Sequence, residues 1–390
     1  MPPQTTLPMT ISEARVYHLS APLEKPYQTT FGAMTHRQAV VITLTTAGGI
    51  AGMGESWINF PLWAPWERIA AFTRGYFPQI IGKLVEDIPG FVRGLWNKNY
   101  RAALQSSTLG PALQAVCAVE AALWDIQGRM RGLPVGKLFS DTPASRVKMY
   151  GSGINPPFLE DAIREALNRG VDTFKLKLGY GDDEDRNNIR RLKAIVGAEG
   201  KIAVDVNRSW TFDKTLSWME YFLDAGIVWL EEPLSIEEQH RYPELLARAA
   251  VPLSAGENFL IPPGSSLANE GESGLTFNQS ALALDIIQPA VVKNCCFSDA
   301  VRLMDLVENQ GKELWPHFLG SAPGLAATAH LVSLTSHPYL EWDINPNPLR
   351  TSLFNEPFSI EDGFFMLTEA PGLGWEINRE KLEKWVVKHG

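Results

Sequence analysis

A regular alternation of short apolar segments with amphipathic ones, running from near Val147 to near Trp342, constrains the fold more than any other feature. This pattern is typical of strand–helix units around a parallel sheet. Strands are predicted at 147–151, 173–178, 202–206, 228–231, 253–256, 285–288, 313–317 and 339–342. Helices are predicted at 159–169, 184–196, 212–225, 236–249, 298–310 and 323–336, whereas 261–280 is rich in Gly, Ser, Pro and Asn and gives no clear fifth helix. Eight such strands favour an α/β fold of the (β/α)8, or TIM-barrel, type over an open sheet.

The first 140 residues predict a different architecture. Strand-like alternation at 14–19 and 39–45 precedes a hairpin turn at the glycine pair 48–49, and helices are predicted at 66–81, 88–100 and 112–130. We therefore expect an N-terminal α+β capping domain at 1–140 and a (β/α)8-type barrel domain at 141–359, joined by a linker near 140–146. The tail, 360–390, is expected to pack back on the first domain.

Charge and cysteine content exclude several classes of protein. The chain has 35 Lys and Arg against 44 Asp and Glu, a formal charge of -9, which argues against a nucleic-acid partner. No apolar run approaches the roughly 20 residues of a membrane helix, and the first ten residues lack the pattern of a secretion signal. Of the three cysteines two are neighbours, so a disulfide scaffold is excluded. We expect a reduced, cytoplasmic protein without a membrane partner.

Three carboxylates end three successive predicted strands. Asp205, Glu231 and Glu257 are each 26 residues apart, about one strand–helix repeat, so they should meet at the carboxyl end of the barrel. One acid alone could equally be a surface residue or a helix N-cap. Three converging carboxylates repel one another unless a cation lies between them, and oxygen ligands of this kind suit Mg²⁺. The sequence therefore predicts one Mg²⁺ per site.

Two lysines, a histidine and a further acid end other strands of the same barrel. Lys175 and Lys177 alternate with leucines, so both should point into the barrel mouth, where a second cation and a metal would depress the pKa of a lysine and suit it to act as a base. His317 ends the seventh strand, and Glu341 ends the eighth. A lone histidine is often a core or surface residue, but the position of His317 across the barrel from the lysines favours a functional role.

These residues occur within motifs that resemble the enolase superfamily, specifically the mandelate racemase and muconate-lactonizing enzyme group. The matching motifs are Lys-Leu-Lys at 175–177, Val-Asp-Val-Asn at 204–207, Trp-Leu-Glu-Glu-Pro at 229–233, Ala-Gly-Glu-Asn at 255–258, Trp-Pro-His at 315–317 and Leu-Glu-Trp-Asp at 340–343. The segments 122–128 and 371–377 also match, so the resemblance covers nearly the whole chain.

The resemblance implies a role for each residue. Asp205, Glu231 and Glu257 would bind Mg²⁺, Lys177 would be the acid/base on one face of the substrate with Lys175 assisting, and His317 would be the acid/base on the other face. Glu341 would hydrogen-bond the substrate carboxylate as it becomes an enediolate. Such chemistry has a simple physical basis, because a metal and a lysine together stabilise the charge that forms when the weakly acidic α-proton leaves.

One position departs from the family pattern. The residue after strand six that orients the histidine is Asp in the racemase pattern and Lys in the muconate-lactonizing pattern, but here it is Ala290. Lys293 matches a lysine found beside either pattern and is not taken as the missing base. We expect His317 to lose the hydrogen bond that would fix its tautomer and stabilise its imidazolium form. This weakens the case for a two-base racemase.

The function predicted on these grounds is α-proton abstraction from a small carboxylate substrate, and we favour dehydration of an acid sugar. Racemisation or epimerisation, lactone cycloisomerisation, and a non-catalytic metal-dependent carboxylate binder remain the alternatives. Loops at 22–32 and 57–66 should cap the mouth with aromatic side chains. The predicted substrate contacts are Lys175, Asn207, Tyr27, Trp57 and Glu341, and we expect a homo-oligomer whose size no residue fixes.

Overall fold

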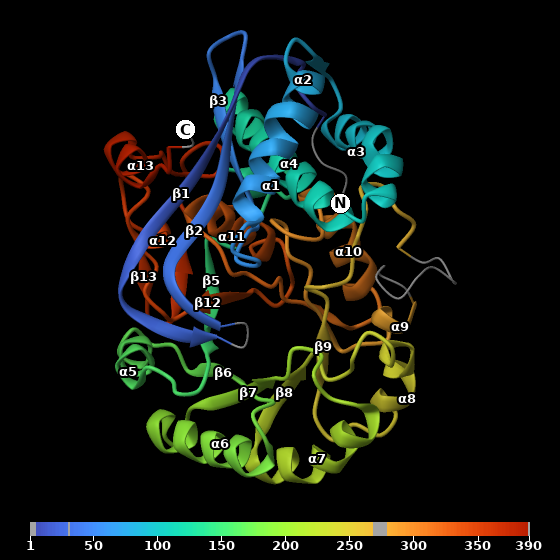
Figure 1. Ribbon diagram of the computed structural model, residues 1–390, viewed down its shortest axis with the longest axis vertical. Helices are drawn as coiled ribbons and strands as arrows, with labels where there is room; N and C mark the ends of the chain where they lie inside the picture. Colours follow the sequence, from blue (N-terminus) through green and yellow to red (C-terminus); the bar gives the residue numbers. More distant parts are fainter. Residues whose placement is uncertain (1–4, 30–31, 268–278, 389–390) are drawn as a thin grey trace.

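A barrel of parallel strands forms the centre of the molecule (Figure 1), seen in a computed structural model that describes residues 5–29, 32–267 and 279–388. Parallel pairing runs without a break from β5 to β11, and β12 pairs with the other side of β5. The strands are β5 (Arg146–Ile154), β6 (Thr173–Lys177), β7 (Lys201–Asp205), β8 (Ile227–Glu231), β9 (Leu253–Ala255), β10 (Ile286–Ile287), β11 (Glu313–Leu314) and β12 (Tyr339–Asp343). The predicted (β/α)8-type fold is confirmed.

Helices alternate with these strands along the chain. They are α5 (Glu160–Asn168), α6 (Asp182–Val196), α7 (Phe212–Ala225), α8 (Tyr242–Leu246), α9 (Gln279–Leu282), α10 (Phe297–Glu308), α11 (Ala322–Val332) and α12 (Pro348–Thr351). The helix predicted at 236–249 is wrong in extent, because the structure has only a 3-10 turn at Gln239–Arg241 before α8, whose first turn contains Pro243. Most of the ill-defined segment 261–280 lies outside the described residues.

The N-terminal part of the chain forms an antiparallel sheet in the order β3-β2-β1-β4. The strands are β1 (Met9–Thr29), β2 (Gly32–Thr46), β3 (Ala51–Ser56) and β4 (Leu84–Val85). The helices are α1 (Ala64–Ala70), a π-helical turn (Ala71–Tyr76), α2 (Phe77–Ile80), α3 (Ile88–Gln105), α4 (Leu109–Arg131) and a 3-10 turn (Val135–Leu138). The two predicted strands are much longer than expected, and β3 was missed because its two glycines give it a weak strand pattern.

Those glycines let helix α4 pack directly on β3. A Cβ atom at Gly54 would collide with the carbonyl oxygen of Ala118, and one at Gly52 would collide with that of Ala122. The expectation that no apolar run is long enough for a membrane helix is wrong for α4, which within the described ranges is the one helix long and apolar enough by length and composition. However, 83% of its most apolar window is buried inside the protein. It is the core helix of the first domain.

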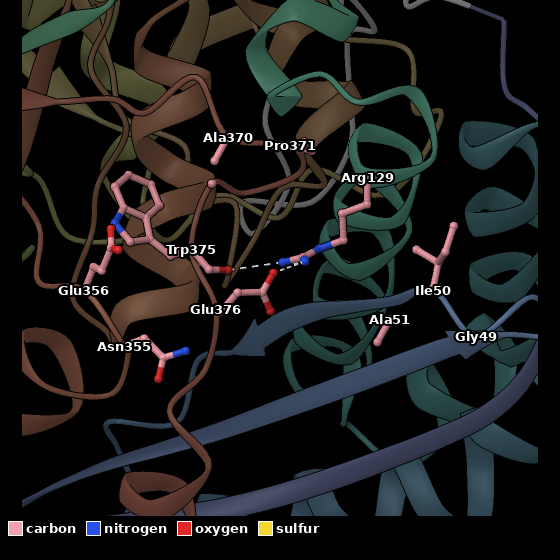
Figure 2. A pocket seen from close by; sticks show the side chains of 11 residues that line it. Gly49, Ile50, Ala51, Arg129, Asn355, Glu356, Ala370, Pro371, Trp375 and Glu376 are labelled. Carbon is pink, nitrogen blue, oxygen red and sulfur yellow. Dashed lines mark hydrogen bonds and ion pairs between the residues drawn. The ribbon is translucent and has the colours of Figure 1, made fainter.

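The C-terminal tail contacts both the barrel and the first domain. Strand β14 (Phe364–Met366), after β13 (Ile360–Glu361), pairs antiparallel with β5, and helix α13 (Arg379–Trp385) follows. Figure 2 shows the pocket where the tail meets α4: Arg129 forms an ion pair with Glu376 and donates to the carbonyl oxygen of Trp375 at 3.1 Å. The backbone N–H of Val387 donates to the carbonyl of His18 at 2.8 Å, so the end of the tail pairs with β1.

Candidate active site

The register of the barrel strands brings the predicted acids to one level. Lys177 pairs with Asp205 across β6 and β7, and Asp205 pairs with Glu231 across β7 and β8. Glu257 follows β9 through Gly256, whose φ of 153° and close approach to the backbone of Gln288 exclude a side chain at that position. The carboxylates therefore gather at the carboxyl end of the barrel, as predicted.

Lys175 is the centre of an ion-pair network beneath the barrel mouth. Its Nζ lies 2.7 Å from both carboxylate oxygens of Glu231, 2.8 Å from Oε1 of Glu341 and 3.8 Å from Oδ2 of Asp205. Lys177 forms an ion pair with Asp205. Lys175 is 1% exposed, so it acts on the site from below rather than from the open surface.

The pKa values of the two lysines differ from the sequence-based expectation. Burial alone would lower the pKa of Lys177, but the charge of Asp205 outweighs it and the pKa is raised. Burial would also lower the pKa of Lys175, but the charges of Glu231 and Glu341 outweigh burial and raise this pKa well above its ordinary value. The expectation of a depressed pKa counted a metal cation beside the lysines, whereas these directions follow from the protein groups alone.

His317 is held by two carboxylates from other strands. Its Nδ1 lies 2.7 Å from Oε2 of Glu257 and 2.9 Å from Oε2 of Glu341. Neither contact has the geometry of a hydrogen bond at Nδ1, and both are ion pairs when the ring is protonated. Burial lowers the pKa of His317, but Glu257 and Glu341 outweigh it and raise the pKa to about 9. The structure therefore gives this ring no hydrogen bond at Nδ1 that would fix its tautomer, as expected from Ala290. The expectation that its imidazolium form lacks acidic support is wrong, because Glu257 and Glu341 supply it.

The donor set at this end of the barrel fits a divalent cation that prefers oxygen. Ligand atoms of Glu231, Glu257 and His317 lie within 4.8 Å of one another. The third predicted ligand, Asp205, is not in this group, and it shares with Glu231 a contact to Nζ of Lys175. Oε2 of Glu257 is buried and accepts no hydrogen bond from the described residues. Burial raises the pKa of Glu231 to about 8, so its ionised form depends on nearby positive charge. Such buried carboxylates are suitable Mg²⁺ ligands.

A cavity of about 290 Å³ opens above these groups. Lys177, Glu257, His317 and Glu341 line it from the barrel, and so does Asn207, one of the predicted substrate contacts. The first domain contributes two more of the predicted contacts together with neighbouring side chains: Tyr27, Trp57, Thr29 and Phe60. Lys175, also predicted as a substrate contact, lies beneath the cavity and is not among its described lining residues.

Fewer aromatic side chains of the loops 22–32 and 57–66, the predicted lid, cover the cavity than expected. Trp63 and Trp66 are 63% and 53% exposed to solvent, and Trp66 packs its ring edge-on to His18 rather than over the mouth. Asn59 donates to the carbonyl oxygen of Leu319 at 2.7 Å, so it holds a barrel loop. Residues 30 and 31, which belong to the predicted lid, lie outside the described residues.

Several cavity residues were not predicted as substrate contacts. They are polar and come from the ends of four strands: Ser152, Asn155, Asn258, Lys293 and Asp343. Lys293 Nζ donates to Oδ1 of Asn258 at 2.9 Å and lies 4.8 Å from the ring centre of Trp57. Asp343 shares a strand face with Glu341, two residues before it, and this alternation was the signal that could have identified it.

A first-domain carboxylate fixes the loop that follows His317. Glu55 of β3 accepts hydrogen bonds from the backbone N–H of Ser321 at 2.7 Å, from the hydroxyl of Ser321 at 2.6 Å and from the N–H of Gly324 at 2.9 Å. These groups start α11, where a helix N-terminus favours negative charge. No pattern in the sequence indicates this contact between the domains.

Comparisons with known proteins agree with this geometry. The mandelate racemase / muconate lactonizing enzyme N-terminal domain matches residues 11–140, and the enolase C-terminal domain-like family matches 159–266 and 269–381. The chain therefore belongs to the mandelate racemase/muconate lactonizing enzyme family of the enolase superfamily.

Relatives with assigned reactions are distant but align over nearly their full length. The chain is 25% identical to D-galactarolactone cycloisomerase of Agrobacterium fabrum over 97% of this chain and 99% of that protein. It is 25% identical to arabinonate dehydratase of Saccharolobus solfataricus over 92% and 93%. A crystal structure of a mandelate racemase/muconate lactonizing enzyme from Bordetella bronchiseptica matches with a TM-score of 0.84 and 28% identity, over 97% of this chain and 99% of that one. The chain is thus an enzyme of this superfamily, a lyase or an isomerase.

Proposed function

We propose that this enzyme removes the α-proton of a small carboxylate substrate and dehydrates an acid sugar. The polar lining of the cavity is the observation that carries the choice of substrate. Ser152, Asn155, Asn207 and Asn258 offer hydroxyl and amide groups beside the ionisable residues, and such groups suit a substrate rich in hydroxyls. The cavity of about 290 Å³ is near the lower end of small-molecule sites, which suits a substrate of this size.

Asp205, Glu231 and Glu257 would hold one Mg²⁺ in this proposal. When bound, the ion stabilises the negative charge that develops on the substrate carboxylate as the α-proton leaves. The protein supplies the proton transfers. Lys177 has to give up its ion pair with Asp205 before its amine can accept the proton, and Lys175 stays buried below as a fixed positive charge.

His317 completes the proposed elimination of water. Its ring reaches the cavity from the seventh strand, while Lys177 reaches it from the second. As the C–H electron pair forms the new double bond, the β-hydroxyl leaves and takes a proton from the histidine. The resulting enol then becomes a 2-keto-3-deoxy acid. The contacts of His317 with Glu257 and Glu341 favour a protonated ring, which suits an acid better than a base.

Lactone cycloisomerisation is the second candidate, supported by the similarity to D-galactarolactone cycloisomerase. Racemisation or epimerisation requires His317 to act as a base as well as an acid and is less favoured. A cytoplasmic location and self-association into a homo-oligomer are part of the proposal, and light scattering after size-exclusion chromatography tests the latter.

Proton NMR in D₂O with Mg²⁺ distinguishes these reactions on a panel of acid sugars and their lactones. Loss of the α-proton signal with new 3-deoxy-2-keto resonances would establish the dehydratase, and loss with an intact skeleton would establish a racemase or epimerase. Lys177→Ala should abolish both, with His240→Asn on the surface as a control. Full proton exchange in Lys177→Ala would remove this lysine from the mechanism. Silence of the panel together with Mg²⁺-dependent thermal shifts would favour a binder.

A further inference from the structure

A second cavity, of about 520 Å³, lies at the opposite end of the barrel, where the strands begin. It is lined by the first residues of several strands, including Thr173 of β6, Lys201 of β7 and Tyr339 of β12. The active-site residues lie at the other ends of the same strands. This cavity is therefore separate from the site described above.

Aromatic rings form the floor of this cavity. The ring centres of Trp229 and Trp315 are 5.2 Å apart, and those of Trp315 and Tyr339 are 5.0 Å apart. Trp229 is 2% exposed, whereas Trp315 and Tyr339 are only half-buried and present ring surface to the cavity. Stacked or edge-on contacts with such rings favour a flat, unsaturated ligand.

The rim of the cavity is basic. Every charged residue among its described lining residues is a cation: Arg146, Lys148 and Lys201, with His337 beside them. Lys148 is neutralised by Asp172, whose carboxylate oxygen lies 2.6 Å from its Nζ. Lys201 forms no ion pair within the described parts of the chain, although its charge also acts on Asp172 and helps to lower the pKa of that carboxyl. The guanidinium of Arg146 lies 4.5 Å from the ring centre of Phe364. The rim therefore offers positive charge to an anion.

We propose that this cavity binds a planar aromatic carboxylate, stacked on Trp315 and Tyr339 with its carboxylate facing Lys201 and Arg146. The aromatic floor accounts for the flat apolar part of such a ligand, and the basic rim accounts for its charge. Tyr150 connects this site to the active site, because its ring lies 5.3 Å from that of Trp229 and 5.6 Å from Nζ of Lys175.

The test uses the full-length protein with 2-naphthoate and its uncharged analogue 2-naphthamide, in EDTA, with binding measured by calorimetry. The proposal expects one naphthoate per chain and at least about tenfold weaker binding of the amide. Lys201→Glu, a change at an exposed residue, should weaken naphthoate about tenfold and leave the amide unchanged. Lys98→Glu makes the same charge change at an exposed lysine on α3, which does not line this cavity, and should have no effect.

Several results would overturn the proposal. One is equal binding of acid and amide, and another is naphthoate binding that Lys201→Glu leaves intact. Binding that is lost in Lys177→Ala but not in Lys201→Glu would place the ligand in the active site. Absence of binding at about 1 mM naphthoate would also reject it. Trp315→Leu adds a check on the floor, since it should weaken acid and amide alike.

Discussion

Acidification should unfold this enzyme partly through His330, a buried histidine on α11 that no carboxylate contacts in the described chain. Its Nδ1 accepts a hydrogen bond from the backbone N–H of Gly136 at 3.3 Å, and its Nε2 lies 3.2 Å from the carbonyl oxygen of Leu373. The neutral ring with its proton on Nε2 satisfies both partners. A second proton would place an N–H at Nδ1 directly against the N–H of Gly136.

The magnitude follows from the pKa. Burial lowers the pKa of His330 from 6.5 to about 4, although the contact with Leu373 opposes this change. Because the folded pKa is below the unfolded one, the unfolded chain takes up the proton first. The contribution to stability is intact above about pH 6.5 and is lost as the pH falls from there toward 4. At about pH 5 this pKa difference raises the ratio of unfolded to folded protein by a factor of about 30, which corresponds to about 2 kcal/mol in the free energy of unfolding.

The assay compares urea unfolding of the wild type and His330→Asn at about pH 7.5 and about pH 5. The asparagine oxygen can still accept from Gly136 but carries no charge. The variant lacks the bond to Leu373 and should be about 1 kcal/mol less stable than the wild type at the higher pH. At the lower pH the wild type loses about 2 kcal/mol, so the variant should become about 1 kcal/mol the more stable of the two. His240→Asn, an exposed histidine, is the control. An equal penalty for His330→Asn at both pH values would refute the reasoning.

Three further perturbations test other contacts. Glu55→Gln removes the charge that caps α11 and should cost about 1–3 kcal/mol in the free energy of unfolding, measured by urea denaturation; an unchanged midpoint would contradict this role. Gly54→Ala forces a methyl group against the carbonyl of Ala118 and should cost about 2–3 kcal/mol, whereas Gly110→Ala in open space on α4 should cost nothing; equal effects would argue against close packing there. Adding Mg²⁺ to EDTA-treated protein at about 100 times its Kd should stabilise it by about 2.7 kcal/mol, measured as a rise in Tm, and Asp205→Asn should lose most of that rise.

The sequence alone was sufficient to predict the barrel and to predict that its acids lie together at the carboxyl ends of the strands. Asp205 and Glu231 could be placed together because parallel strands of similar length end at one edge, so a constant spacing in the chain becomes proximity in space. The same argument placed Lys177 beside them, and the paired register of β6, β7 and β8 agrees.

The partners of individual side chains could not be predicted in the same way. His317 contacts Glu257 and Glu341, which follow or belong to other strands, and such contacts depend on side-chain directions across the barrel. The missing acid at Ala290 therefore did not reveal that acids from other strands would support the imidazolium form of the histidine. Strand β3 was missed because Gly54 has no side chain that could show the alternation of a strand. The need for a glycine there becomes clear only in the structure, where α4 packs directly against it.

The capping contact of Glu55 bears on how enzymes of this architecture can diversify. A residue of the first domain holds the start of α11, and the loop just before that helix carries His317. Exchanging the first domain for one without an acid at the position of Glu55 would thus also disturb the residue that we propose to transfer a proton. We expect such a chimera to regain turnover only when a glutamate is restored at that position, so the first domain and the loop that carries His317 have to be exchanged as a matched pair.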